Sequence, residues 1–196
     1  MYERNPAEVD RLTSDLIELS TRQNFAYWLQ LANIYRGWAR SASGDTAKGI
    51  PCIEPGITDL RATGAVLNLP TWLALKAEAL HLAGHTSEAL AAISEAEALA
   101  ERYEIGVCCS QLHRLRGVFL ATLGGDETQI EASFCAAINT AKQEYRMNVA
   151  TNKTEARWDN PMLPVDLIFE QQNRRCARTR RVRPKEPVNR PPANNF

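Results

Sequence analysis

A turn glycine followed by an amphipathic segment recurs in this chain at a period of 40 residues. The turn glycines are Gly44, Gly84 and Gly124, and the middle copy reads "GHTSEALAAISEAEALAE". Its apolar residues recur at helical spacing and predict one buried helix face: Ala89, Leu90, Ile93, Ala96, Leu99 and Ala100. Because one helical hairpin cannot bury such a face alone, the repetition predicts stacked hairpins that share a continuous core.

Small residues recur at matched positions in the two helices of each predicted hairpin. The first helices carry one seven positions before the turn glycine: Gly37, Ala77 and Gly117. The second helices carry one after the turn, with three additional residues in the last repeat: Gly49, Ala89 and Ala132. Since the side chains at a contact set the distance between helix axes, these positions are predicted to let the two helices approach closely.

The other helix boundaries follow from capping residues, prolines and glycines. Asn5 is predicted to cap a helix that begins at Pro6 and keeps an apolar face as far as Leu19. Further helices are expected within residues 25–43, 69–83, 86–105, 109–123 and 127–143. An interior proline costs a helix about 3 kcal/mol. The helix after Gly44 contains Pro51 and Pro55, so we expect it to be shortened, kinked or started again before it ends at Gly64.

The predicted fold class is all-α, with about three antiparallel helix pairs after one leading helix. No alternating run of β-branched residues indicates a strand, and the short connections place consecutive helices antiparallel. Residues 1–143 are the predicted repeat domain. In residues 144–172 a short helix at 164–172 is a candidate cap for the array, and residues 173–196 are predicted to be a disordered basic tail.

These hairpins resemble the tetratricopeptide (TPR) family, whose helices each carry a small residue with an aromatic residue or leucine nearby. A second resemblance rests on "YWLQLANIYRGWARSASGDTAKGI" and "LHRLRGVFLATLGGDETQIEASFCAAINTAKQ" within residues 6–143. These segments look like the C-terminal repeats of large bacterial regulators that join a class III adenylate or guanylate cyclase to an ATPase module. The resemblance implies an α-solenoid that binds proteins or peptides in signalling.

In the TPR family the first helices of the repeats line a concave groove. The resemblance therefore implies five candidate groove residues: Trp38, Glu78, His81, Gln111 and Arg114. The alternative is ordinary packing for Trp38 and ordinary surface for the other four. The sequence identifies neither the partner nor the oligomeric state.

No pattern in the sequence carries catalytic or cofactor chemistry. The phosphate-binding patterns GxxxxGK[ST] and GxGxxG are absent. His81 and His85 lack a third metal ligand, and Cys108 and Cys109 lack a histidine base. The acidic residues of the middle repeat are expected on solvent-facing sides of helices: Glu78, Glu88, Glu95, Glu97 and Glu101. We therefore expect no enzymatic activity, no cofactor and no metal.

Cysteine usage and hydropathy favour a cytoplasmic protein. The five cysteines form an odd set without CxxC spacing, which is typical of reduced thiols. No apolar run is long enough to span a membrane, and the charged start "MYERNPAEVDRL" argues against a signal peptide.

The basic residues are concentrated near the C-terminus. Residues 174–190 hold eight of the 23 basic residues but one of the 23 acidic ones. The proposed basic patch consists of six arginines: Arg174, Arg175, Arg178, Arg180, Arg181 and Arg183. Such a segment fits phosphate contacts with a nucleic acid, attraction to an anionic membrane surface, or a solvated C-terminus without a partner.

Overall fold

The computed structural model describes residues 5–106 and 108–152, and side chains as far as Arg146. The chain divides into two units, Met1–Thr154 and Glu155–Phe196, and the described helices all belong to the first. The predicted cap at 164–172 and the basic patch lie outside the described residues. The described residues contain no strand and form these helices: α1 (Pro6–Arg22), α2 (Ala26–Ala42), α3 (Thr46–Ala62), α4 (Leu69–Leu82), α5 (Thr86–Arg102), α6 (Cys109–Thr122) and α7 (Glu127–Asn152).

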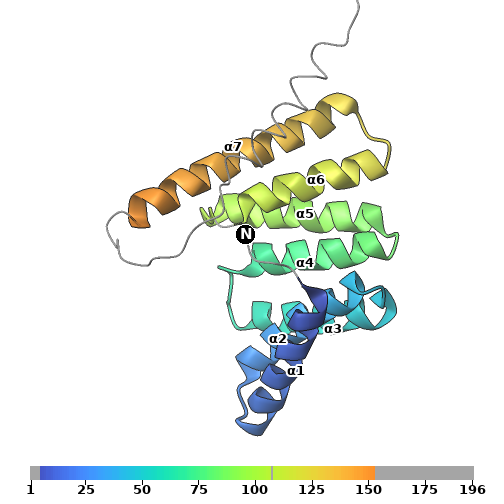
Figure 1. Cartoon of the computed structure of the whole chain (residues 1–196), viewed down its shortest axis with the longest axis vertical. Helices are drawn as coiled ribbons and strands as arrows, with labels where there is room; N and C mark the ends of the chain where they lie inside the picture. Colours follow the sequence, from blue (N-terminus) through green and yellow to red (C-terminus); the bar gives the residue numbers. More distant parts are fainter. Residues whose placement is uncertain (1–4, 107, 153–196) are drawn as a thin grey trace, which may run out of the picture. The chain divides into compact units, whose positions relative to one another are not determined.

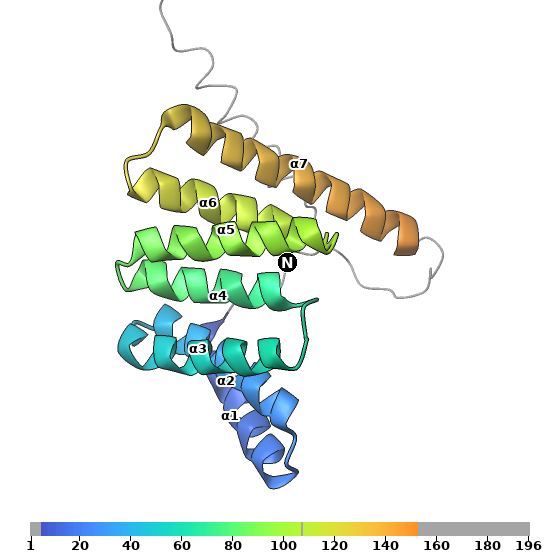
Figure 2. The same ribbon diagram turned by 180° about the vertical axis from the view of Figure 1, so that it is seen from behind.

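The helices pack as three successive antiparallel pairs with one leading helix. α2 packs on α3, α4 on α5 and α6 on α7, while α1 packs on α2 (Figure 1). The pairs are joined because α4 also contacts α2, α3 and α6, and α6 contacts α5. Seen from behind, α4, α5, α6 and α7 follow one another in the same order (Figure 2). This arrangement confirms the predicted stack of hairpins.

Large apolar side chains from successive pairs form one core. Ile34 of α2, Trp72 of α4, Ile93 of α5 and Phe119 of α6 are almost completely buried and belong to a single cluster. Full burial of one such side chain stabilises the fold by about 1.5–3 kcal/mol. The core therefore runs through the stack, as the repeat pattern predicts.

The matched small residues lie where paired helices come closest. A Cβ atom built on Gly37 of α2 would lie 2.5 Å from Ile53 Cγ1 of α3. One built on Gly117 of α6 would lie 2.9 Å from the ring of Phe134 of α7. Ala77 and Ala89 occupy the corresponding contact in the middle pair and are completely buried.

The register predicted for Ala132 is corrected by the structure. Ile53 and Phe134 each lie seven residues after the first residue of their helices, Thr46 and Glu127. The last repeat therefore contains one additional residue, next to Gly124, instead of three. Counted in this register, Ile130 corresponds to Gly49, whereas Ala132 is exposed.

The two prolines do not interrupt α3, which corrects the expectation of a broken helix. α3 is continuous from Thr46 to Ala62 with Pro51 and Pro55 inside it. Both prolines are exposed and lie four residues apart, so they share one face of the helix. A proline has no N–H to donate to the carbonyl four residues earlier, so the carbonyls of Ala47 and Pro51 lack a partner in the helix. These two carbonyls lie on the same exposed face and can bond to water. The opposite face, including Ile53, remains packed on α2.

The last helix is longer than predicted. α7 ends at Asn152, nine residues beyond the expected end at Gln143. Residues 143–152 contain neither glycine nor proline, so no local signal stops the helix there. The predicted boundary at 143 therefore falls inside α7.

None of the described helices is long and apolar enough to cross a lipid bilayer.

Capping at the start of α1 follows the sequence prediction. The Asn5 side chain accepts hydrogen bonds from the backbone N–H groups of Ala7 (3.2 Å) and Glu8 (3.4 Å).

We expect Asn5→Ala to lower the free energy of unfolding by about 1 kcal/mol, measured by urea denaturation. Asn24→Ala is unsuitable as a control because Asn24 has a positive φ of 57°. Gln23→Ala is suitable, since Gln23 is exposed, and no effect beyond about 0.5 kcal/mol is expected.

Thiols at the start of α6 predict a pH dependence of stability. Burial raises the pKa of the Cys108 thiol and, with nearby Glu144, that of Cys109. Above the ordinary thiol pKa of about 8.5, the unfolded chain therefore loses these protons first, and stability falls as pH rises. Replacing both residues with serine should flatten the decline in stability above pH 8. Cys135→Ser, at an exposed thiol, should leave the decline unchanged.

Candidate functional site

The first helices of the three pairs are joined by one carboxylate. Glu78 of α4 accepts a hydrogen bond from Trp38 Nε1 of α2 at 2.6 Å. Its second oxygen accepts a hydrogen bond from Gln111 Nε2 of α6 at 3.0 Å and lies 3.5 Å from Arg114 Nη2. We call the surface carrying these four residues the first-helix face.

The bond between Trp38 and Glu78 joins equivalent positions of adjacent repeats. The two residues are 40 positions apart, which is the repeat period. The Glu78 side chain is 12% exposed, so its hydrogen bonds are partly shielded from water. Hydrogen bonds to a charged group contribute about 1.5–3 kcal/mol each. The network therefore fixes α4 against both neighbouring first helices.

Trp38 takes part in this face through its indole N–H. The residue is 6% exposed and belongs to the core cluster. This burial fits the alternative of ordinary packing for Trp38 that the sequence left open. Its contribution is to orient Glu78.

Arg114 gives the first-helix face an accessible cation. Its side chain is 46% exposed, and its Nε donates to Gln111 Oε1 at 3.0 Å. The guanidinium is thus oriented by Gln111 while part of it faces solvent. An oriented guanidinium binds carboxylates through paired hydrogen bonds. Chemically, the face offers a positioned cation next to a partly shielded carboxylate.

His81 does not join the other four predicted residues. Its Nδ1 lies 3.1 Å from Thr86 Oγ1 at the start of α5, and its ring lies 4.8 Å from the Phe119 ring. His81 therefore packs at the turn between α4 and α5 and against α6. The structure brings together four of the five predicted residues and places His81 in helix packing.

Two acidic residues expected at the solvent are instead partly enclosed. Glu88, Glu95 and Glu101 are exposed, as predicted. Glu78 lies in the network of the first-helix face, and the Glu97 side chain is 23% exposed and pairs with Arg116 of α6. Helical periodicity alone missed these positions because the partner side chains come from other helices, 16 or more residues away in the sequence. Within the described residues no cluster of His, Cys, Asp and Glu is suited to hold a metal ion.

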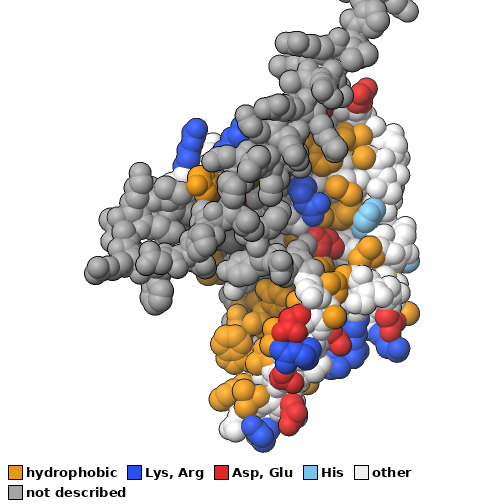
Figure 3. Space-filling model, viewed as in Figure 1, with side chains coloured by type: hydrophobic (Ala, Val, Ile, Leu, Met, Phe, Trp, Pro, Cys, Tyr) orange, Lys and Arg blue, Asp and Glu red, His pale blue; other side chains and the backbone are white. Residues whose placement is uncertain are grey.

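An apolar surface at the junction of α1 and α2 was not predicted. Figure 3 shows hydrophobic side chains gathered over these helices. Leu19, Phe25, Tyr27 and Trp28 are all exposed, and the Tyr27 and Trp28 rings meet edge to face at 5.6 Å. The adjacent aromatic residues "FAYW" were the available signal.

The chain is similar over part of its length to an uncharacterized protein. No known protein-family profile matches it. Over 111 residues, 57% of this chain, it is 29% identical to an uncharacterized protein of Rhizobium meliloti (strain 1021). The chain spans only 11% of the length of that curated relative.

A solved structure is similar to this fold. It is the crystal structure of Bacillus thuringiensis PlcR in complex with the peptide PapR7 and DNA. The TM-score is 0.61 at 20% sequence identity, and the match covers 76% of this chain and 54% of that one. At this identity the likeness shows the fold alone. The predicted all-helical, TPR-like repeat architecture is confirmed by the seven described helices and by this likeness.

Proposed function

We propose that the first-helix face binds a peptide segment of a partner protein, and that this binding serves regulation. The single observation that carries the proposal is the network in which Glu78 joins Trp38, Gln111 and Arg114 across α2, α4 and α6. A preorganised face lowers the entropy lost on binding because its side chains are already fixed.

The chemistry of the face suggests which peptides it prefers. The exposed part of the Arg114 guanidinium suits a peptide carboxylate, either a side chain or a C-terminus. The amide of Gln111 is held between Glu78 and Arg114, which leaves the cation in a defined orientation. We therefore propose an acidic peptide or a free C-terminal carboxylate as the preferred ligand. The structure of the similar protein PlcR in complex with a peptide supports a peptide as the kind of ligand.

Selection of peptides from a random library tests this function. The full chain is immobilised, displayed peptides are selected, and each is measured against Arg114→Gln and the control Arg61→Gln on α3. Arg61 is exposed and pairs with Glu95, so its change in charge is matched but distant from the face. The proposal requires that the selected peptides carry carboxylates. Their affinity should fall about tenfold for Arg114→Gln and should not fall for Arg61→Gln. Peptides that bind both variants equally would contradict it.

A nucleic-acid function through the arginine-rich segment is the second candidate. The concentration of eight basic residues in 174–190 favours it, since each phosphate contact makes binding depend on salt. Replacing the six arginines of the basic patch with glutamine in the full chain should abolish retention of duplex DNA. The unmodified chain should lose affinity at least about a hundredfold between 50 and 200 mM salt if five or more phosphates are contacted. Retention that is independent of these arginines would reject this candidate.

A relation to cyclase-type signalling proteins stays a prediction from the sequence, and so does the absence of enzymatic activity. A cytoplasmic location is supported by the four described cysteines, which are all free thiols.

A further inference from the structure

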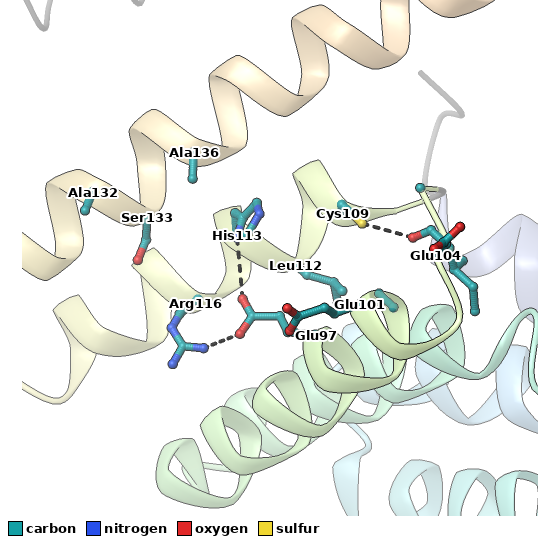
Figure 4. Close-up of a pocket in the computed structure, with 13 residues that line it drawn as sticks. Glu97, Glu101, Glu104, Cys109, Leu112, His113, Arg116, Ala132, Ser133 and Ala136 are labelled. Carbon is teal, nitrogen blue, oxygen red and sulfur yellow. Dashed lines mark hydrogen bonds and ion pairs between the residues drawn. The ribbon is translucent and has the colours of Figure 1, made fainter.

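A cleft of about 680 Å³ opens between α5, α6 and α7, and none of the residues that line it belongs to the Glu78 network (Figure 4). Its apolar floor includes Ile105 and Leu112, which are both buried. Its walls on α7 carry the small side chains of Ala132 and Ala136. The space exists because these small residues do not fill the distance between α7 and the end of α5. We call it the α5–α7 cleft.

The cleft has more carboxylates than cations. Glu97, Glu101 and Glu104 line it, together with Arg116 and His113. Arg116 pairs with Glu97 Oε2, and Figure 4 shows this pair on the wall of the cleft. Among the described residues, neither Glu101 nor Glu104 forms an ion pair or side-chain hydrogen bond. Three carboxylates outnumber these two basic side chains, so the lining carries a net negative charge.

One carboxylate oxygen in the cleft lacks a hydrogen-bond donor. Glu97 Oε1 is inaccessible to water and accepts no hydrogen bond, although His113 Nδ1 lies 3.5 Å from it. A buried acceptor without a donor costs about 1–3 kcal/mol. Because this oxygen is buried, the carboxylates that a ligand in the cleft can reach are those of the exposed Glu101 and Glu104.

We propose that the α5–α7 cleft binds an arginine side chain of a partner peptide that also carries an apolar neighbour. The guanidinium presents five N–H donors and keeps its charge at any physiological pH, which suits the exposed and unpaired carboxylates of Glu101 and Glu104. An adjacent leucine of the peptide covers the floor at Ile105 and Leu112. This site is separate in chemistry from the first-helix face, which prefers a carboxylate.

The test is an NMR titration of the isotopically labelled full chain with the blocked peptide acetyl-Leu-Arg-Leu-amide. The matched ligand replaces arginine with citrulline, which keeps the shape and removes the charge. We expect shifts at Ala132 and Ala136, and binding at least about tenfold weaker for the citrulline peptide. Glu101→Gln with Glu104→Gln should weaken arginine binding similarly, whereas Glu127→Gln with Glu131→Gln, exposed on α7 outside the cleft, should not.

A second variant tests the cleft without changing charge. Ala132→Leu fills the space from an exposed position, so the fold should persist while binding is lost. Equal binding of the citrulline peptide, or binding unaffected by Ala132→Leu, would overturn the proposal. A third outcome would also overturn the proposal: the resonances of Ala132 and Ala136 shift with protein concentration before any peptide is added. The occupant of the cleft would then be a second copy of the chain.

Discussion

Replacing Gly49 with valine is expected to lower the free energy of unfolding by about 3 kcal/mol. A Cβ atom on Gly49 would collide with Ser41 Oγ and with the backbone oxygen of Gly37, and would lie 3.0 Å from the Ser41 nitrogen. Two of these three atoms belong to the backbone of α2, so no rotamer change relieves the overlap. α2 and α3 must therefore separate, which also loosens the contact of Gly37 with Ile53.

Urea denaturation of Gly49→Val and of Ala47→Val measures this effect. Ala47 is exposed on the same helix, so its variant reports the helix propensity of valine alone, about 0.5 kcal/mol. The difference between the variants isolates the cost of separating the helices. Equal destabilisation by the two variants would show that the close approach of α2 and α3 contributes nothing to stability.

Replacing Glu78 with glutamine is expected to cost about 2 kcal/mol and to weaken peptide binding more than tenfold. The carboxylate accepts hydrogen bonds at both oxygens, from Trp38 on one and from Gln111 on the other. Glutamine has one acceptor oxygen, so its NH₂ group would face either the Trp38 indole or the Gln111 amide, donor against donor. Arg114 would also lose its anionic neighbour and with it part of its orientation.

Glu95→Gln is the matched control for this change. Glu95 pairs with Arg61 at 2.6 Å, but both side chains are about half exposed, so the pair contributes about 0–1 kcal/mol. Thermal unfolding measures the stability of both variants, and calorimetric titration with a selected peptide measures affinity. If Glu78→Gln and Glu95→Gln have the same affinity as the unmodified chain, the Glu78 network does not organise the binding face.

The sequence predicted the repeat architecture because the responsible signals are local. The positive φ at Gly44, Gly84 and Gly124 needs glycine at the turn. The small residues Gly37 and Gly117 report a close helix approach by their size alone. These features recur at one spacing, so the number and order of the helix pairs could be predicted from the sequence.

Other features depend on atoms that come from different helices. The continuity of α3 was missed because the cost of Pro51 and Pro55 depends on whether the unpaired carbonyls face water. The register of α7 was missed because the small residue expected at the position of Gly49 was sought and found at Ala132, whereas the structure has Ile130 there. Only the contact of Phe134 with Gly117 shows the register.

Four of the five candidate groove residues lie together in the structure, but their contacts with one another could not be predicted. Periodicity placed Trp38, Glu78, Gln111 and Arg114 on the first helices, but it could not show that Trp38 is buried and acts through its N–H. It also could not reveal the α5–α7 cleft, because that space depends on where Ala132 and Ala136 of α7 lie relative to the end of α5.

Hydrogen exchange of the full chain with a selected peptide tests the central claim most directly. If the first-helix face binds the peptide, amide protection should rise in α2, α4 and α6, and it should do so less in Arg114→Gln at the same peptide concentration. α3, α5 and α7 should change little. Protection confined to α3, α5 and α7, or protection that Arg114→Gln leaves intact, would contradict peptide binding at the first-helix face.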